Sequence, residues 1–343
     1  MDILNNAIIT NDCIRASVDV SEEELQNFCV GYGDILFQRS SETLEDVGRA
    51  NVYMDDKPAV FGGFVIRGKK KAEFNPLFFR DLLASPFARK KIIPMGAGAQ
   101  HFNIGQEGLN KVKLNFPNLK EQEKIGRFLT LLDKRIAIQS KVIEDLKKLK
   151  CAIIEKVYSE IQGKEYSYGQ LFNVVNERNK QMEYSNILSA SQEKGMVNRV
   201  DLNLDIQFER SNINTYKIVR KGDYVIHLRS FQGGFAFSDK LGVCSPAYTI
   251  LRPNSLLEYG YLSNYFTSQR FIKSLVLVAY GIRDGRSINV DEWLRMKITI
   301  PPKEHQQYIV EVIGTFERKI EDEEAYAAQL SIQKQYLLRQ MFV

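Results

Sequence analysis

The sequence predicts an α+β protein that contains one unit twice, each copy being a mixed α/β domain followed by a long helix. Residues 117–158 and 301–342 follow one pattern at a constant separation of 184 positions (301 − 117). Upstream of each helix, a Gly-Asp pair opens an apolar run, Gly33–Phe37 in one copy and Gly222–Ile226 in the other, and such runs are typical of strands. A duplication of this length indicates an internal repeat with pseudo-twofold character.

The two long helices carry matched apolar seams. Apolar residues recur in alternating steps of four and three, which is the a/d spacing of a left-handed coiled coil. The seam positions are Ile125, Leu129, Leu132, Ile136, Gln139, Ile143, Leu146, Lys150, Ile153 and Val157 in the first copy, and Ile309, Ile313, Phe316, Ile320, Glu323, Ala327, Leu330, Lys334, Leu337 and Met341 in the second. The polar interruptions match in position and are expected to fix the register of an antiparallel pair. The alternative is two unrelated amphipathic helices, each buried in its own core.

The segments between the Gly-Asp strands and the long helices also correspond. A second strand is predicted at Gly63–Arg67 and at Tyr248–Arg252, followed by a helix from about Pro76 to Ile92 or from about Tyr259 to Val276, and then by a Gly-rich loop. The first copy has only 32 residues before Gly33 (33 − 1), whereas the second has 56 between Tyr166 and Gly222 (222 − 166). The first domain is therefore expected to be short by about one strand and a loop. The predicted segments are residues 1–116, 117–161, 165–300 and 301–343.

Composition bounds the class of protein. The chain has 343 residues, 44% of them hydrophobic, and it contains no apolar run long enough to span a membrane. The start of the chain does not resemble a signal peptide, so a soluble, cytoplasmic protein without a membrane partner is expected. The cysteines Cys13, Cys29, Cys151 and Cys244 show no paired spacing, which favours free thiols. A net charge of +5 permits nucleic-acid binding without requiring it.

Three possible catalytic or metal motifs fail on their chemistry. Gly63–Lys70 matches part of a phosphate-binding loop, but Lys70 stands where a Ser or Thr would hold magnesium. Asn75–Phe78 partly matches a DNA amino-methyltransferase signature, but Pro76 is explained as the first residue of a helix, and no methyl-donor loop precedes it. His101, His227 and His305 share no ligand spacing with cysteines or carboxylates, so no metal site is predicted.

Polar and basic side chains on the loops of both domains are candidates for reading DNA. Arg, Gln, Ser, Asn and His can bond to base edges, and Lys and Arg neutralise phosphates. The candidates in the first domain are Gln38, Arg39, Ser40, Lys69, Lys70, Lys71, Gln100, His101 and Asn103. Those in the second are Ser191, Gln192, Lys194, Arg199, His227, Arg229, Ser230, Gln232, Arg283 and Arg286. A solvated loop with no DNA role would carry similar residues.

The start of each long helix resembles a known family. Pro117-Asn118-Leu119-Lys120-Glu121-Gln122-Glu123-Lys124-Ile125 is similar to the Pro-x-Leu-x-Glu-Gln-x-x-Ile stretch of type I restriction–modification DNA specificity subunits (S, or HsdS). The second copy keeps Gln306 and Ile309 but has His305 where the family has Glu. The resemblance covers nearly the whole chain, including Gly33-Asp34, Gly222-Asp223 and Gly281.

The resemblance implies two mixed α/β target-recognition domains, separated by two long antiparallel coiled-coil helices. Each domain would read one half of a bipartite, asymmetric double-stranded DNA target. The subunit would be non-catalytic and bind no cofactor itself, since S-adenosylmethionine, ATP and Mg belong to its partners. Those partners would be two adenine methyltransferase (M) subunits and the restriction (R) subunits. The alternative is a non-catalytic coiled-coil scaffold or adaptor protein without DNA binding.

Overall fold

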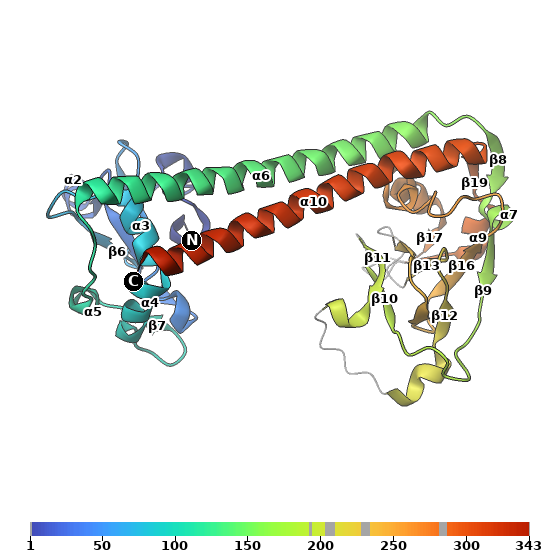
Figure 1. Cartoon of the computed structure of the whole chain (residues 1–343), viewed down its shortest axis with the longest axis horizontal. Coiled ribbons are helices and arrows are strands. Elements are labelled where there is room, and N and C mark those ends of the chain that lie inside the picture. The colour runs from blue at the N-terminus through green and yellow to red at the C-terminus, as the bar shows by residue number, and fades with distance from the viewer. Residues whose placement is uncertain (1, 192–193, 203–209, 228–233, 281–286, 343) are drawn as a thin grey trace. The chain divides into compact units, whose positions relative to one another are not determined.

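The computed structural model (Figure 1) describes residues 2–191, 194–202, 210–227, 234–280 and 287–342. These residues form two compact units. The first comprises residues 1–143 and 322–343, and the second comprises residues 144–321. Each unit therefore combines one α/β domain with a segment from both long helices.

The first unit is built from short elements around a three-stranded antiparallel sheet of order β4-β2-β6. Its helices are α1 (Asp2–Asn5), α2 (Glu22–Phe28), α3 (Pro76–Ala84), α4 (Pro86–Ile92) and α5 (Gln106–Lys111), with 3-10 turns at Asn11–Cys13, Leu44–Asp46 and Ile93–Met95. Its strands are β1 (Cys29–Val30), β2 (Ile35–Gln38), β3 (Ser40–Ser41), β4 (Ala50–Val52), β5 (Ala59–Val60), β6 (Val65–Gly68) and β7 (Phe102–Asn103). β1 pairs with β5, and β3 with β7.

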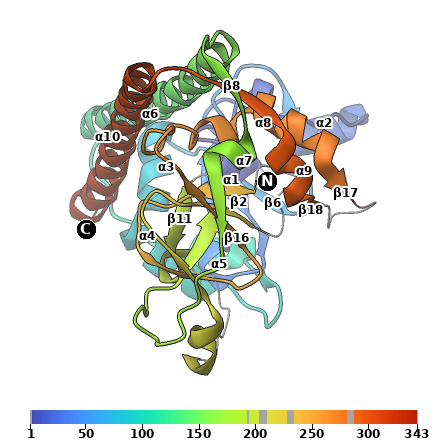
Figure 2. The ribbon, with the colours of Figure 1, turned by 90° about the vertical axis from the view of Figure 1, so that its right-hand side faces the viewer.

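The second unit has a four-stranded antiparallel sheet of order β14-β13-β16-β9. Its strands are β8 (Lys164–Ser167), β9 (Phe172–Val175), β10 (Leu188–Ser191), β11 (Gly195–Asn198), β12 (Lys217–Val219), β13 (Tyr224–Ile226), β14 (Phe235–Phe237), β15 (Gly242–Cys244), β16 (Thr249–Pro253), β17 (Ala279–Tyr280), β18 (Ser287–Ile288) and β19 (Lys297–Ile300). Its helices are α7 (Tyr168–Leu171), α8 (Gln269–Ser274) and α9 (Val290–Arg295), with 3-10 turns at Arg199–Leu202, Arg210–Thr215, Tyr265–Thr267 and Leu275–Val278. Figure 2 turns this unit toward the viewer.

Each of the two sheets packs against a hydrophobic core, and the side chains that fill the two cores differ. Trp293 is fully buried and stacks on Tyr168 with ring centroids 4.2 Å apart. Phe266 lies among several further rings, including that of Phe235 at 5.0 Å. The first unit instead buries mainly aliphatic residues, such as Val47, Ile92 and Ile104. Both sheets therefore bury their faces beneath the helices that follow them, which is the expected arrangement for an α+β layer.

The long helices are α6 (Leu119–Ser159, 41 residues) and α10 (Lys303–Met341, 39 residues). Within the first unit, Leu129 of α6 packs with Leu337, Met341 and Phe342 of the α10 end, beside Phe78 of α3. Within the second, Ile154 of α6 packs with Ile313 of α10. Low numbers on α6 thus meet high numbers on α10, so the pairing is antiparallel in both units. None of the predicted seam residues is exposed, and the coiled-coil prediction is confirmed.

The lysines of the two seams form ion pairs at equivalent positions of the two repeats. Lys150 pairs with Glu317 at 2.6 Å in the second unit. Lys334 pairs with Asp133 in the first. Lys334 is the counterpart of Lys150, and Glu317 that of Asp133, since both are 184 positions further on (334 − 150 and 317 − 133). The register expected from the polar interruptions is therefore held by the same ion pair twice.

Three local expectations need correction. The helix predicted at Pro76–Ile92 is interrupted at Ser85, whose backbone is extended (ψ 150°) because Pro86 disfavours a helical conformation in the residue before it. The helix predicted from about Tyr259 to Val276 is largely wrong, since residues 259–264 form turns, residues 265–267 and 275–278 form 3-10 turns, and only Gln269–Ser274 (α8), capped by Ser268, is α-helical. The two second strands are Val65–Gly68 and Thr249–Pro253. Gly68 lies opposite Ile35 and Leu251 lies opposite Tyr224, so the equivalent of Arg67 is Ile250 and not Arg252.

Among the helices that the structure describes, none combines the length and the apolar character that crossing a lipid bilayer would require.

Candidate nucleic-acid interface

The first domain brings several predicted DNA-binding residues together where β3 pairs with β7. Ser40 lies opposite Asn103, and its hydroxyl donates to the Asn103 side-chain oxygen. Asn103 Nδ2 in turn donates to the His101 carbonyl at 3.4 Å. Gln38 Nε2 donates to the Ser40 carbonyl at 2.9 Å, which orients the turn between β2 and β3. We call Arg39, Ser40, His101 and Asn103 the β3–β7 cluster.

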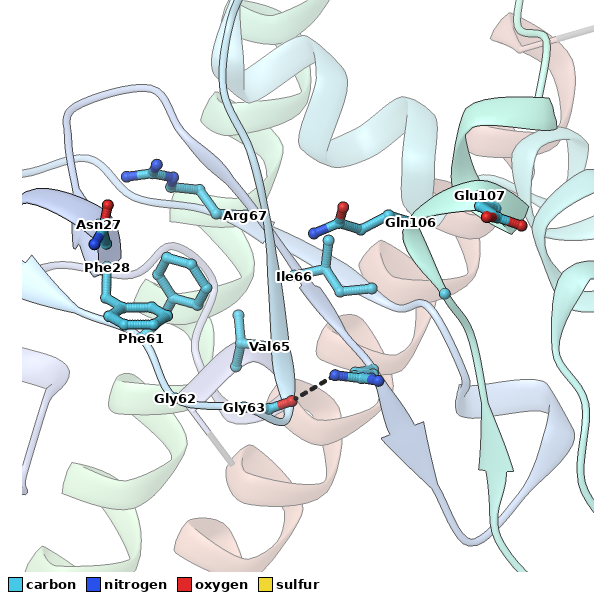
Figure 3. Close-up of a pocket in the computed structure, with 12 residues that line it drawn as sticks. Asn27, Phe28, Phe61, Gly62, Gly63, Val65, Ile66, Arg67, Gln106 and Glu107 are labelled. Atoms are coloured by element: carbon cyan, nitrogen blue, oxygen red, sulfur yellow. Dashed lines mark hydrogen bonds between the residues drawn. The ribbon is translucent and has the colours of Figure 1, made fainter. Parts of the chain in front are cut away.

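Arg39 is the exposed cation of this cluster. Its Nη1 donates to the Gly63 carbonyl at 3.4 Å, the interaction drawn as a dashed line in Figure 3. A contact of that length to a neutral, exposed carbonyl is weak. The guanidinium can therefore exchange it for a stronger, charge-assisted bond to a phosphate or a guanine edge.

The three lysines that follow β6 do not join the β3–β7 cluster. β6 is antiparallel to β2, with Gly68 opposite Ile35 and Val65 opposite Gln38. Lys69, Lys70 and Lys71 therefore lie near the start of β2, whereas Arg39 follows its end. At about 3.3 Å per residue the two sets are separated by roughly 10 Å or more along the strand. Lys70 lies 3.9 Å from Glu73, and both side chains are exposed, so this pair contributes little stability.

Gly98 allows the first Gly-rich loop to close on itself. Gly98 has a φ of +143°, and a Cβ placed on it would lie 2.0 Å from the His101 carbonyl oxygen. No other residue type fits that close approach. Gln100 and His101 are exposed next to this turn, so the loop presents them to solvent from a constrained backbone.

In the second domain the described candidates fall at two places. Ser191 and Lys194 form the tip of the β10–β11 hairpin, where the Lys194 amide donates to Ser191 Oγ at 3.3 Å. Arg199 and His227 instead lie near Tyr248. The His227 ring is 6.2 Å from the Tyr248 ring. Burial raises the pKa of the Tyr248 hydroxyl, and the positive charge of Arg199 opposes that rise.

The remaining candidates lie outside the described residues. These are Gln192, Arg229, Ser230, Gln232, Arg283 and Arg286. Among the residues that the structure does describe, no group of three or more His, Cys, Asp or Glu side chains could hold a metal ion.

The glutamine at the start of each long helix has a role that sequence reasoning missed. Gln122 Oε1 accepts the backbone N–H of Asn75 at 3.0 Å, and its Nε2 donates to the Pro117 carbonyl at 2.8 Å. Gln306 repeats this arrangement, accepting from the Glu258 N–H at 2.8 Å and donating to the Pro301 carbonyl at 3.0 Å. Both side chains are almost fully buried.

These glutamines join each α/β domain to its helix, and a signal for this was present in the sequence. Gln122 stands three residues before Ile125 and Gln306 three before Ile309, which places each glutamine on the apolar face of its helix. A buried glutamine at such a position must be satisfied by nearby polar groups. Only the partners, Asn75 and Glu258, could not be read from the sequence.

The Gly-Asp pairs serve a matching structural role. Asp34 Oδ2 accepts the Gly31 N–H at 2.9 Å, and Asp223 Oδ2 accepts the Arg220 N–H at 2.9 Å. Gly33 and Gly222 both have positive φ, +84° and +91°. Each pair therefore makes a turn that leads into an inner strand of its sheet, and both aspartates are buried.

This architecture defines a duplicated recognition scaffold, with two versions of one α/β domain, each tied by a buried glutamine to one of two antiparallel helices. The chain belongs to the type I restriction modification DNA specificity domain family, which it matches over residues 2–148 and 161–331.

Individual relatives agree with this assignment. A putative type I restriction enzyme MjaX specificity subunit from Methanocaldococcus jannaschii is 26% identical over 146 residues, covering 41% of this chain and 34% of that protein. The match thus spans about a third of the relative's length.

Two solved structures have the same fold. The crystal structure of the HsdS subunit from Thermoanaerobacter tengcongensis is 15% identical with a TM-score of 0.51, over 90% of this chain and 80% of that one. A chain from a study of complex assembly and conformational transition of the type I R-M system is also 15% identical, with a TM-score of 0.58, over 90% and 81% of the two chains.

Proposed function

We propose that this chain is the DNA sequence-specificity subunit of a type I restriction–modification system. The observation that carries the proposal is the presence of two specificity domains of one family in a single chain. Two DNA-recognition domains in one polypeptide suit a target with two separate, unequal halves, because the side chains of the two domains differ. The β3–β7 cluster of the first domain would read one half, and the hairpin tip and the Arg199–His227 surface of the second would read the other.

The proposed chemistry is recognition without catalysis. In this proposal, methyl transfer to adenine and DNA cleavage are carried out by two M subunits and by R subunits, which bind S-adenosylmethionine, ATP and Mg. The exposed flank of α6, including Lys134, Lys141, Asp145 and Lys148, is a candidate surface for an M subunit. We expect one M subunit per repeat.

The function is tested by expressing the chain with its M subunit in cells that lack adenine methylation and sequencing the methylome. We expect a single two-part motif containing methylated adenines. Unmethylated DNA, in spite of a purified and assembled complex, would favour the scaffold alternative.

Binding to the motif then tests individual residues. Arg39→Ala should weaken cognate binding by about 1–3 kcal/mol and affect non-specific duplex less. Lys70→Ala and Lys71→Ala should weaken all sequences alike and reduce the salt slope. Lys273→Ala, at an exposed position of α8, is the control for a lost surface charge. Arg229→Ala, Arg283→Ala and Arg286→Ala belong in the same series. If all the folded arginine variants retain cognate affinity and the methylated motif, the assignment of these loops is wrong.

A further inference from the structure

A pocket of about 670 Å³ lies along β6 of the first domain. Figure 3 shows its two walls, with Val65 and Arg67 on β6 and with Asn27 and Phe28 at the end of α2. Phe61 lies between these walls and completes an apolar floor. β6 is the outermost strand of its sheet, so the pocket borders an unpaired strand edge.

The second domain shows what the equivalent space contains, because strand register matches the two domains position by position. Ile35 opposite Gly68 corresponds to Tyr224 opposite Leu251. Cys29 opposite Val60 corresponds to Ile218 opposite Val243. By this register, the equivalent of Arg67 is Ile250, and the equivalents of Asn27 and Phe28 are Tyr216 and Lys217.

In the second domain an extended segment joins these two walls. Val175 of β9 pairs with Ile250. The chain then crosses to the other wall, where Arg178 bridges to Lys217, the Glu177 carbonyl accepts the Ile218 N–H at 2.8 Å, and the Asn179 N–H donates to Tyr216 at 2.9 Å. The pocket of the first domain is therefore the space that residues 175–179 fill in the second.

The elements that precede this segment also have no described counterpart in the first domain. β8 pairs with β19 in the second domain, and Tyr168 of α7 stacks on Trp293. The equivalents of β19 are residues 113–116, which form no strand, and Phe116 is 54% exposed. The uncovered surface thus runs from the pocket to Phe116.

The charges of the pocket indicate the chemistry of its occupant. Arg67 donates to the Cys29 carbonyl and lies 5.5 Å from the Phe61 ring centre, while Arg39 donates to Gly63. Glu107 is the one carboxylate among the lining residues. In the second domain the segment supplies Glu177, which pairs with both Arg220 and Arg252 at 3.2 Å. By the strand register, Lys69 is the equivalent of Arg252 and Gly31 that of Arg220. A carboxylate at that position would therefore be matched by Lys69 and by Arg67, which reaches Cys29, the equivalent of the Ile218 that bonds Glu177.

We propose that this pocket binds an extended segment of a partner polypeptide, which adds a strand to β6 as β9 adds one to β16. The segment carries a β-branched apolar residue at the position of Val175 and a carboxylate at the position of Glu177. Main-chain hydrogen bonds to an open strand edge supply affinity, and side-chain pockets supply selectivity. Such binding also removes an edge that would otherwise be free to pair non-specifically.

The test uses a labelled 16-residue peptide with the sequence of residues 164–179 and the full-length chain. We expect saturable one-to-one binding in fluorescence anisotropy. Hydrogen exchange should slow at residues 65–70 and 27–29. Arg67→Glu should weaken binding at least tenfold, and a peptide carrying Glu177→Arg should restore binding to that variant. Lys273→Glu, at an exposed position of α8, is the control for an equal change in charge far from the pocket in sequence, and it should leave binding unchanged.

Several outcomes would overturn the proposal. Equal binding of a scrambled peptide, no binding at all, or an Arg67→Glu variant that binds normally would each do so. Slower exchange confined to β16 would show that the peptide displaces the chain's own β9. A concentration-dependent dimer that Arg67→Glu dissociates would identify a second copy of this chain as the occupant instead of a different partner.

Discussion

Gln139 and Glu323 occupy equivalent positions of the two repeats, 184 residues apart, and they hydrogen-bond to each other. Gln139 Nε2 donates both to the Glu323 carboxylate and, at 3.3 Å, to the Glu323 carbonyl. In an antiparallel pair of equivalent helices, a residue can meet its own counterpart only at the middle of the register. The polar break therefore marks that midpoint.

The Gln139–Glu323 link should show non-additive energetics. Gln139→Leu removes the amide donor from the Glu323 carboxylate and should lower the free energy of unfolding by about 1–3 kcal/mol. Replacing both residues with leucine should recover that loss or exceed it, since an apolar seam packs well at these positions. Urea unfolding of the two single variants and the double variant measures the coupling. Additive effects would show that the bond contributes nothing to stability.

Hydrogen exchange should distinguish the effects of the two buried glutamines, Gln122 and Gln306. Gln122→Ala leaves the Asn75 N–H without its acceptor, so exchange at Asn75 should accelerate while exchange at Glu258 is unchanged. Gln306→Ala should give the reverse pattern. Each change should cost about 1–3 kcal/mol, because a buried backbone group loses its partner. Gln335→Ala, at an exposed position of α10, is the control and should alter neither site.

Arg80 should be among the most sensitive positions of the first unit. It is 8% exposed, and its guanidinium bonds to Asp81 and, at 2.7 Å, to Asp133 of α6. Arg80→Ala should destabilise the protein by about 3–5 kcal/mol, because it leaves buried carboxylate charge without its partner. Thermal unfolding followed by circular dichroism measures the effect. A loss below about 1 kcal/mol would mean that solvent reaches this group of charges.

The pH dependence of stability should report on Asp81. Burial raises the pKa of this carboxyl above its ordinary value of 3.8, and Arg80 opposes the rise. The folded state then holds the proton more tightly than the unfolded state. The contribution of Asp81 is therefore most favourable below about pH 4 and is lost as pH rises through the folded pKa. Asp81→Asn should make stability fall less between pH 4 and pH 7, as measured by urea unfolding across that range.

The cysteines should differ sharply in reactivity. Burial raises the pKa of the Cys244 thiol to about 12, whereas Cys151 is exposed on α6. At pH 8 iodoacetamide should modify Cys151 in the folded protein and reach Cys244 only on unfolding, because the thiolate is the reactive form. Peptide mass mapping before and after denaturation checks this, and Cys151→Ser serves as the control for site assignment.

The helices were predictable because a seven-residue period needs no knowledge of the rest of the molecule. Every seam position from Ile125 to Met341 is shielded as expected. Pro86 in the sequence indicates a helix break at Ser85. The apolar residues on both sides of Ser85 nevertheless led to the prediction of one continuous helix. The two-residue error in matching Arg67 to Arg252, when its equivalent is Ile250, arose because register depends on pairing with β2 and β13, which is a non-local contact.

The candidate site was less predictable for the same reason. Arg39, Ser40 and Asn103 meet because β3 pairs with β7, although 63 residues separate Ser40 from Asn103. Lys69–Lys71 resembled part of the same surface until the antiparallel register placed them at the other end of β2. Composition identified suitable side chains, but sheet order determined which of them are neighbours.

The amide of Gln122 has a consequence for motion. One planar group holds the Asn75 N–H on one side and the Pro117 carbonyl on the other. If α6 rotated about its own axis, the Gln122 side chain would be carried around that axis and away from the Asn75 N–H, and the hydrogen bond would break. The first α/β domain must therefore rotate together with the start of α6. A torque applied to the loops of this domain is then transmitted to the helix.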